Sequence, residues 1–140
     1  MIGKAFIDTN ILIYSISAED AVKKAEAIAL IRDRKGLHIS PQVIFEFIHS
    51  SVRKTKIERA VAIGCARGFL SSFKLVVPNA GVVENSMRIM ERYGLSCWDS
   101  QVIVSALASD GDILYTEDLQ HGQVFEKTLK VVNPFLSRKT

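Results

Sequence analysis

Short apolar segments alternate along this chain with longer segments of helical periodicity. Residues 4–8 and Leu37–Ile39 are short, apolar and bounded by polar residues, which is typical of buried strands. Each is followed by a helix-start signal, and Ser40 with Pro41 forms an N-cap followed by proline at the first helical position. Strands that alternate with helices predict a mostly parallel sheet flanked by helices, an α/β three-layer sandwich.

The remaining elements are expected from the same signals. Predicted strands cover 4–8, 37–39, 74–77, 112–115 and 130–132. Predicted helices cover 11–16, a stretch from a capping box at Ser17 and Asp20 to a stop at Gly36, then 41–54, 57–73, 82–93 and 96–109. The second of these helices has its apolar residues at helical spacing: Val22, Ala25, Ile28, Ala29 and Ile31.

Length and composition limit the chain to one compact unit. With 140 residues, 48% of them hydrophobic, residues 1–140 are expected to form a single domain. The net charge of +3 permits a polyanionic partner without requiring one. No apolar segment approaches the roughly 20 residues of a membrane span, so a cytoplasmic protein is expected. Cys65 and Cys97 lack metal-site spacing and are expected to be reduced thiols.

Four acidic residues lie within or next to apolar segments: Asp8, Glu46, Asp99 and Asp118. A carboxylate in such surroundings must be hydrogen-bonded, paired or bound to a metal ion. Asp8 and Asp118 each follow a predicted strand, and ligands of open α/β sheets bind beyond the carboxyl ends of the strands. Asp99 begins a helix and Glu46 lies about two turns into another, so all four are expected to converge at that edge.

Each acid also has a purely structural interpretation. Asp8 can cap the helix that follows it, and Ser96 with Asp99 forms a capping box. Asp118 can serve a polar turn. Glu46 shares a helical stripe that could be a solvated face; its other members are Gln42, His49, Ser50 and Arg53.

Convergence of the four acids would require a cation. Two carboxylates about 4 Å apart repel by roughly 4 kcal/mol near a protein surface. Oxygen ligands without thiolates or a histidine cluster select Mg²⁺ or Mn²⁺, and Mg²⁺ commonly completes its shell with substrate phosphate. The chemistry indicated is metal-assisted phosphoryl or phosphodiester hydrolysis.

Four short motifs, in this order along the chain, resemble those of PIN-domain ribonucleases, in particular VapC-type toxins. They are Asp8-Thr9-Asn10, Glu46, Trp98-Asp99 and Thr116 with Asp118. The resemblance implies an endoribonuclease using Mg²⁺ or Mn²⁺, with Asp8 and Asp99 as primary metal ligands and Glu46 and Asp118 completing the site. It implies that Thr9, Asn10 and Thr116 orient the acids or the scissile phosphate. It also implies a homodimer and a small antitoxin partner.

The basic run Arg53, Lys54, Lys56 and Arg59 could bind RNA backbone, or it could be a solvated surface cluster. Four other functions compete with a toxin, of which a receiver domain is disfavoured because its paired acids after the first strand are absent. One is an inert PIN-like module that binds RNA or protein, and another is a housekeeping RNA-processing nuclease. A phosphatase of the haloacid-dehalogenase type is disfavoured, because it needs a second aspartate where this chain has Asn10.

Overall fold

A computed structural model describes residues 3–136, which form a six-stranded sheet between two layers of helices. The strand order is β3-β2-β1-β4-β6-β5, and every pairing is parallel except that of β5 with β6. The strands are β1 (Ala5–Ile7), β2 (Leu37–Ile39), β3 (Lys74–Leu75), β4 (Ile113–Tyr115), β5 (Val124–Phe125) and β6 (Leu129–Val132). The predicted fold class is therefore confirmed.

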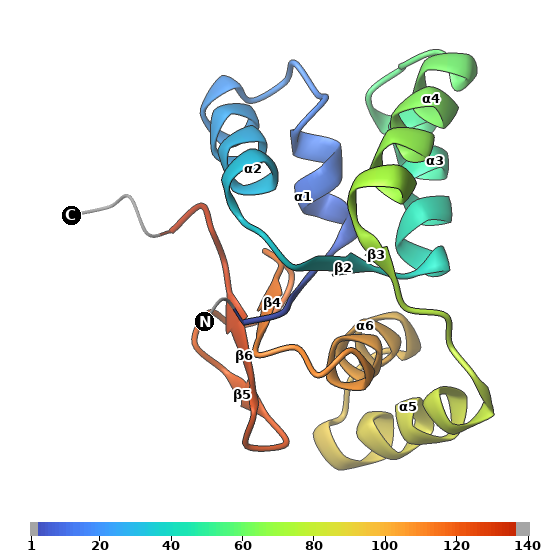
Figure 1. Ribbon diagram of the computed structural model, residues 1–140, viewed down its shortest axis with the longest axis vertical. Coiled ribbons are helices and arrows are strands. Elements are labelled where there is room, and N and C mark those ends of the chain that lie inside the picture. The colour runs from blue at the N-terminus through green and yellow to red at the C-terminus, as the bar shows by residue number, and fades with distance from the viewer. Residues whose placement is uncertain (1–2, 137–140) are drawn as a thin grey trace.

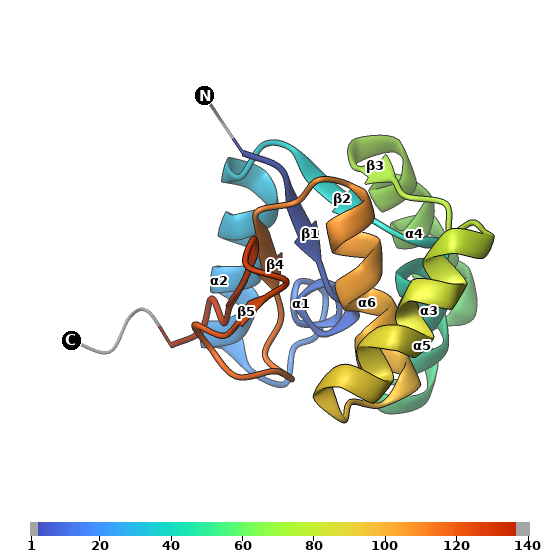
Figure 2. The ribbon, with the colours of Figure 1, turned by 90° about the horizontal axis from the view of Figure 1, so that it is seen from below.

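The helices divide between the two faces of the sheet. They are α1 (Thr9–Tyr14), α2 (Ala21–Asp33), α3 (Pro41–Lys54), α4 (Arg59–Ser72), α5 (Ala80–Tyr93) and α6 (Cys97–Ala108). Figure 1 shows α1 to α4 on one side of the sheet and α5 with α6 on the other. Seen from below in Figure 2, α6 crosses in front of the sheet, and α5 lies along its outer side. None of the helices in residues 3–136 is long and apolar enough to cross a membrane.

Buried residues of the sheet and of α6 form the centre of the core. Phe6, Leu114 and Val131, from three neighbouring strands, are fully buried. Helix α6 is apolar on nearly all sides, and Ile103 at its middle is fully buried. A helix that is apolar all round is expected to be enclosed, because burying that surface stabilises the fold. Here α6 lies between the sheet and α5.

Three local predictions need correction. Helix α2 is capped by Asp20, which accepts a hydrogen bond from the Lys23 N–H, and not by Ser17. It ends at Asp33, before Gly36. Its apolar spacing does not mark a core face, since Val22 is 73% exposed. Strand β5 was not predicted, because two residues carry too little pattern to be recognised.

Candidate active site

The carboxyl ends of β1 and β4 lie side by side and bring the first acid and the last loop together. The parallel pairing aligns Ile7 with Tyr115, and the Asp8 N–H donates a 3.0 Å hydrogen bond to the Tyr115 carbonyl. Asp8 is therefore adjacent to Thr116, which follows β4 directly. This is the edge at which open parallel sheets bind ligands.

Asp8 is a buried carboxylate with two hydrogen-bond donors. Its Oδ1 accepts from the Thr9 N–H at 2.7 Å, which makes Asp8 the N-cap of α1, and its Oδ2 accepts from the Thr116 hydroxyl at 2.9 Å. Burial raises the pKa of Asp8 to about 6, and the negative charges of Asp118 and Glu46 add to that rise against the two hydrogen bonds. Asp8 is therefore both the N-cap of α1 and one of the acids at this edge of the sheet.

Glu46 reaches the same edge from α3. Its Oε2 accepts from the Thr9 hydroxyl at 3.2 Å, and its Oε1 accepts from the Gln42 amide at 2.8 Å. Gln42 lies one helical turn before Glu46, where side chains i and i+4 meet. The Oε1 atom of Gln42 is buried and has no hydrogen-bond partner among the described residues. Gln42 orients Glu46, a role that the shared helical stripe alone did not reveal.

Asp118 is held by the first turn of α1. Asn10 donates through Nδ2 to Asp118 Oδ2 at 2.9 Å and to the Thr116 hydroxyl at 3.3 Å. The backbone N–H of Asp118 donates to the same hydroxyl at 3.1 Å. Thr9, Asn10 and Thr116 thus form a polar network that connects Asp8, Glu46 and Asp118. The role of these three residues in orienting the acids or the scissile phosphate stays a prediction.

Asp99 joins the group from the N-terminus of α6. Its backbone N–H donates to the Ser96 hydroxyl at 3.1 Å, the first half of the predicted capping box. Partial burial raises the pKa of Asp99, and the charges of Asp118 and Glu46 raise it further. These same two charges also raise the pKa of Asp8, so Asp8 and Asp99 each lie within electrostatic range of Glu46 and Asp118.

These residues fit a divalent cation by donor chemistry and by charge. All the candidate ligands are carboxylate oxygens, and burial, with the neighbouring charges of Glu46 and Asp118, raises the pKa of both Asp8 and Asp99. Among residues 3–136, however, no three His, Cys, Asp or Glu side chains are close enough to form one closed site. An ion here would take few protein ligands and complete its shell with water and substrate oxygens, as Mg²⁺ commonly does.

The acid beside Asp118 belongs to a different cluster. Glu117 accepts a 2.5 Å hydrogen bond from the Tyr14 hydroxyl and pairs with Lys23 at 2.7 Å. The Lys23 ammonium also lies over the rings of Tyr14 and Phe135, 4.7 and 5.2 Å from their centres. The Glu117 carboxylate is therefore engaged by Tyr14 of α1 and Lys23 of α2. The one sequence signal for this cluster is the spacing of Asn10 and Tyr14, which places both on one face of α1.

The predicted basic run lies beyond the acids at the far end of α3 and the start of α4. Arg53, Lys54, Lys56 and Arg59 are all exposed. The Arg53 guanidinium contacts the His49 imidazole at 3.4 Å. Neither Arg53 nor Arg59 has a carboxylate within ion-pair distance in the described part of the chain.

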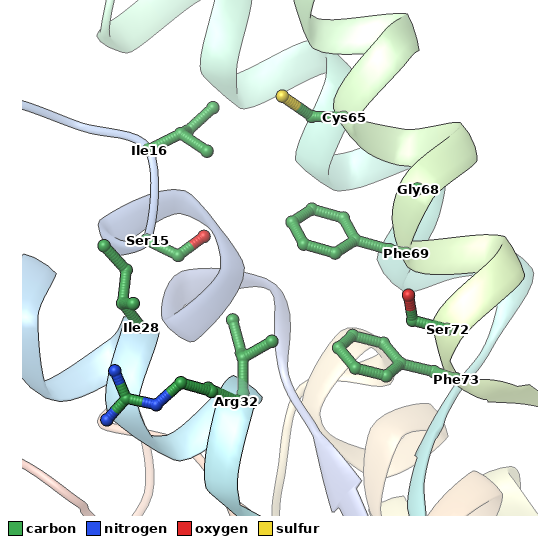
Figure 3. A pocket seen from close by; sticks show the side chains of 10 residues that line it. Ser15, Ile16, Ile28, Arg32, Cys65, Gly68, Phe69, Ser72 and Phe73 are labelled. Carbon is green, nitrogen blue, oxygen red and sulfur yellow. The ribbon is translucent and has the colours of Figure 1, made fainter.

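An apolar hollow of about 500 Å³ lies between α2 and α4, on the helical layer and apart from the acids. Figure 3 shows the rings of Phe69, in α4, and Phe73, just after α4, pointing into the hollow from the side opposite Ile16, Ile28 and Arg32. Ile28 is 41% exposed, so the described residues leave part of this apolar surface in water. Such a surface commonly marks an interaction site.

The model of the PIN domain family matches residues 5–126 of this chain. The chain belongs to the PIN domain family, whose model spans every acid described above. A comparison with curated protein sequences gives no match.

Solved structures of VapC toxins and their complexes share the fold. One is a toxin–antitoxin complex from Klebsiella pneumoniae, with a TM-score of 0.68 and 21% identity, covering 94% of this chain and 98% of that chain. Another is VapC20 of Mycobacterium tuberculosis, described as a sarcin-ricin loop cleaving toxin, with a TM-score of 0.70, 18% identity and coverages of 82% and 90%. A third is VapBC2 of Rickettsia felis bound to a promoter DNA fragment, with a TM-score of 0.65, 19% identity and coverages of 95% and 100%.

Proposed function

We propose that this protein is a metal-dependent endoribonuclease and the toxin of a VapBC-type toxin–antitoxin pair. The observation that carries the nuclease proposal is the buried Asp8, whose pKa is raised to about 6 while Glu46 and Asp118 add negative charge around it. A domain that retains repelling carboxylates at a sheet edge gains nothing from them for stability. Perturbed carboxylates in such a position are typical of functional sites.

Each of the four acids has a role that follows from its surroundings. Asp8 and Asp99 would hold Mg²⁺ or Mn²⁺, with Glu46 and Asp118 completing the site directly or through water. A divalent cation supplies charge stabilisation for the phosphate during in-line hydrolysis. Thr9 and Gln42 hold both oxygens of Glu46, and Asn10 holds Asp118 Oδ2, so each carboxylate has a defined direction. Glu46 or Asp118 accepts the proton of the attacking water, and the released oxygen of the RNA is protonated in turn.

The partners proposed are RNA, a small antitoxin and a second copy of this chain. The antitoxin would lay an apolar helix face into the hollow between α2 and α4, because helix-in-groove binding requires such an apolar channel. Homodimer formation is supported by exposed apolar side chains on α5 and α6, where Val83 is 52%, Met87 48% and Trp98 62% exposed. Solved relatives of the same fold are described as toxin–antitoxin complexes.

The test is cleavage of a mixed transfer and ribosomal RNA pool by the purified protein. Reactions contain Mg²⁺ or Mn²⁺, EDTA, or the Asp99→Asn variant as a control for contaminating nuclease. We expect discrete fragments that require both the metal ion and Asp99. Equal cleavage by the variant would contradict the assignment of the site. Metal binding by calorimetry without any cleavage would instead favour an inert binding module.

A further inference from the structure

A second hollow, of about 300 Å³, lies on the outer face of α3 beside the first residue of α4. It is lined by Phe45, Ile48, His49, Val52, Arg53 and Arg59. The lining is half apolar and half basic, and it contains no acidic side chain. An occupant of this hollow must therefore offer an apolar surface and negative charge together.

The hollow begins next to the acidic site. Phe45 is the residue before Glu46, and His49 lies one helical turn further along the same helix. Arg53 is a second turn on, and its guanidinium contacts His49 at 3.4 Å. At 1.5 Å of rise per residue, Arg53 lies about 10 Å from Glu46 along the helix axis. The hollow is thus within reach of a chain whose reacting group is at the acids.

The arginines of the hollow have uncompensated charge. Within residues 3–136, neither Arg53 nor Arg59 forms an ion pair, whereas Arg88 and Arg92 both pair with Glu126. Guanidinium groups bind phosphate strongly and in a defined geometry. Two unpaired arginines on one hollow therefore favour an anionic occupant.

Phe45 supplies the apolar part. Its side chain is 67% exposed, although it belongs to a 14-residue helix whose other phenylalanine, Phe47, is fully buried. Exposed aromatic rings beside basic side chains are the usual means by which proteins bind single-stranded nucleic acid, since any base can stack on the ring. A second copy of this chain is disfavoured as occupant. A two-fold contact through this face would bring Arg53 and Arg59 against the same charges of the partner copy.

We propose that this hollow is an RNA subsite for a nucleotide flanking the scissile phosphate, with the base stacked on Phe45 and its phosphate bound by Arg53 and Arg59. This inference rests on the proposed nuclease function. The proposed subsite adds Phe45 to the site as a base-binding residue. It also gives the RNA a direction: from the acids, the strand runs along α3 toward the start of α4.

The experiment measures binding of a fluorescent single-stranded RNA oligomer by anisotropy, with every variant built on the cleavage-deficient Asp99→Asn background. Phe45→Ala is compared with Leu70→Ala, another exposed apolar residue, and Arg53→Ala with Arg67→Ala, another exposed arginine. We expect Phe45→Ala to raise Kd roughly five- to a hundredfold with an unchanged salt dependence, and Phe45→Trp to restore binding. Arg53→Ala should lower the slope of log Kd against log salt by about 0.7.

Two results would overturn the subsite. One is that Phe45→Ala binds the RNA as tightly as Leu70→Ala, and Arg53→Ala as tightly as Arg67→Ala, although the protein without any substitution cleaves RNA. The other is a change from dimer to monomer in Phe45→Ala by light scattering, which would show that a second copy covers this face. The cleavage assay of the parent protein tests the nuclease separately, so failure of the subsite and failure of the nuclease are distinguishable.

Discussion

The Thr116 hydroxyl donates a 2.9 Å hydrogen bond to Asp8 Oδ2 across 108 residues of sequence. The Thr116 hydroxyl oxygen in turn accepts hydrogen bonds from the Asp118 N–H and from the Asn10 amide. One buried hydroxyl thus connects the acid after β1 with the acid of the β4 loop. Its loss would disturb both carboxylates at once.

Thr116→Val should destabilise the apoprotein by about 1–3 kcal/mol, because it leaves a buried carboxylate with one donor fewer. Thr116→Ser keeps the hydroxyl and is the matched control. The measurement is urea unfolding at pH 7.5 in EDTA, with RNA cleavage followed in parallel. If the valine variant matched the serine variant in both, the hydroxyl would not organise the site.

Asp8 should make the metal-free protein less stable as pH rises. The pKa of Asp8 is raised from 3.8 to about 6 by folding, so between these values the folded chain binds more protons than the unfolded chain. The free energy of unfolding from this group is therefore highest below pH 4 and falls through pH 6, by about 3 kcal/mol for a shift of about two pKa units. Denaturant unfolding from pH 4 to 8 measures this.

Asp8→Asn should remove the fall in the free energy of unfolding that ionisation of Asp8 causes. The variant should therefore become increasingly more stable than the parent from pH 4 to pH 7. The exposed Asp110 provides a control, since Asp110→Asn should follow the parent at every pH. A parallel pH dependence in the parent and Asp8→Asn would show that other groups govern it.

A bound divalent metal ion should offset the destabilisation that the ionised Asp8 causes in the metal-free protein. Mg²⁺ or Mn²⁺ that binds only the folded chain adds about 2.7 kcal/mol at a hundredfold excess over Kd. We expect Tm to rise with metal in the parent and to return on adding EDTA, and we expect little rise in Asp8→Asn or Asp99→Asn. A similar rise in both variants would place the ion elsewhere.

The neighbouring acids Glu117 and Asp118 should differ sharply in cleavage. Asp118→Asn removes a carboxylate of the site, and a loss of roughly a hundredfold or more is expected. Glu117→Gln breaks the partly exposed pair with Lys23, which is worth at most about 1 kcal/mol, and should leave cleavage within about twofold. Comparable losses in the two variants would mean that Glu117 also serves the reaction.

The sequence predicted the site edge because Asp8 and Asp118 follow strands, and parallel strands end at a common edge. It could not separate Glu117 from Asp118, since their difference arises from Lys23, which lies far away in sequence and comes close only in the fold. The spacing of Val22 and its neighbours predicted a helix correctly but did not identify its buried face, since Val22 is exposed and Ala27 is fully buried. Periodicity records which residues share a face, and tertiary packing decides whether that face is buried.

The central pairing of β1 with β4 also has a consequence for synthesis of the protein. Asp8 follows the first strand, whereas Thr116 and Asp118 follow a strand made more than 100 residues later. Because chains are made from the N-terminus, most of this domain must leave the ribosome before the acids can meet. If the protein cleaves RNA, a nascent chain cannot damage the ribosome that makes it until β4 has paired with β1. Late closure of the sheet thus delays activity until synthesis is nearly complete.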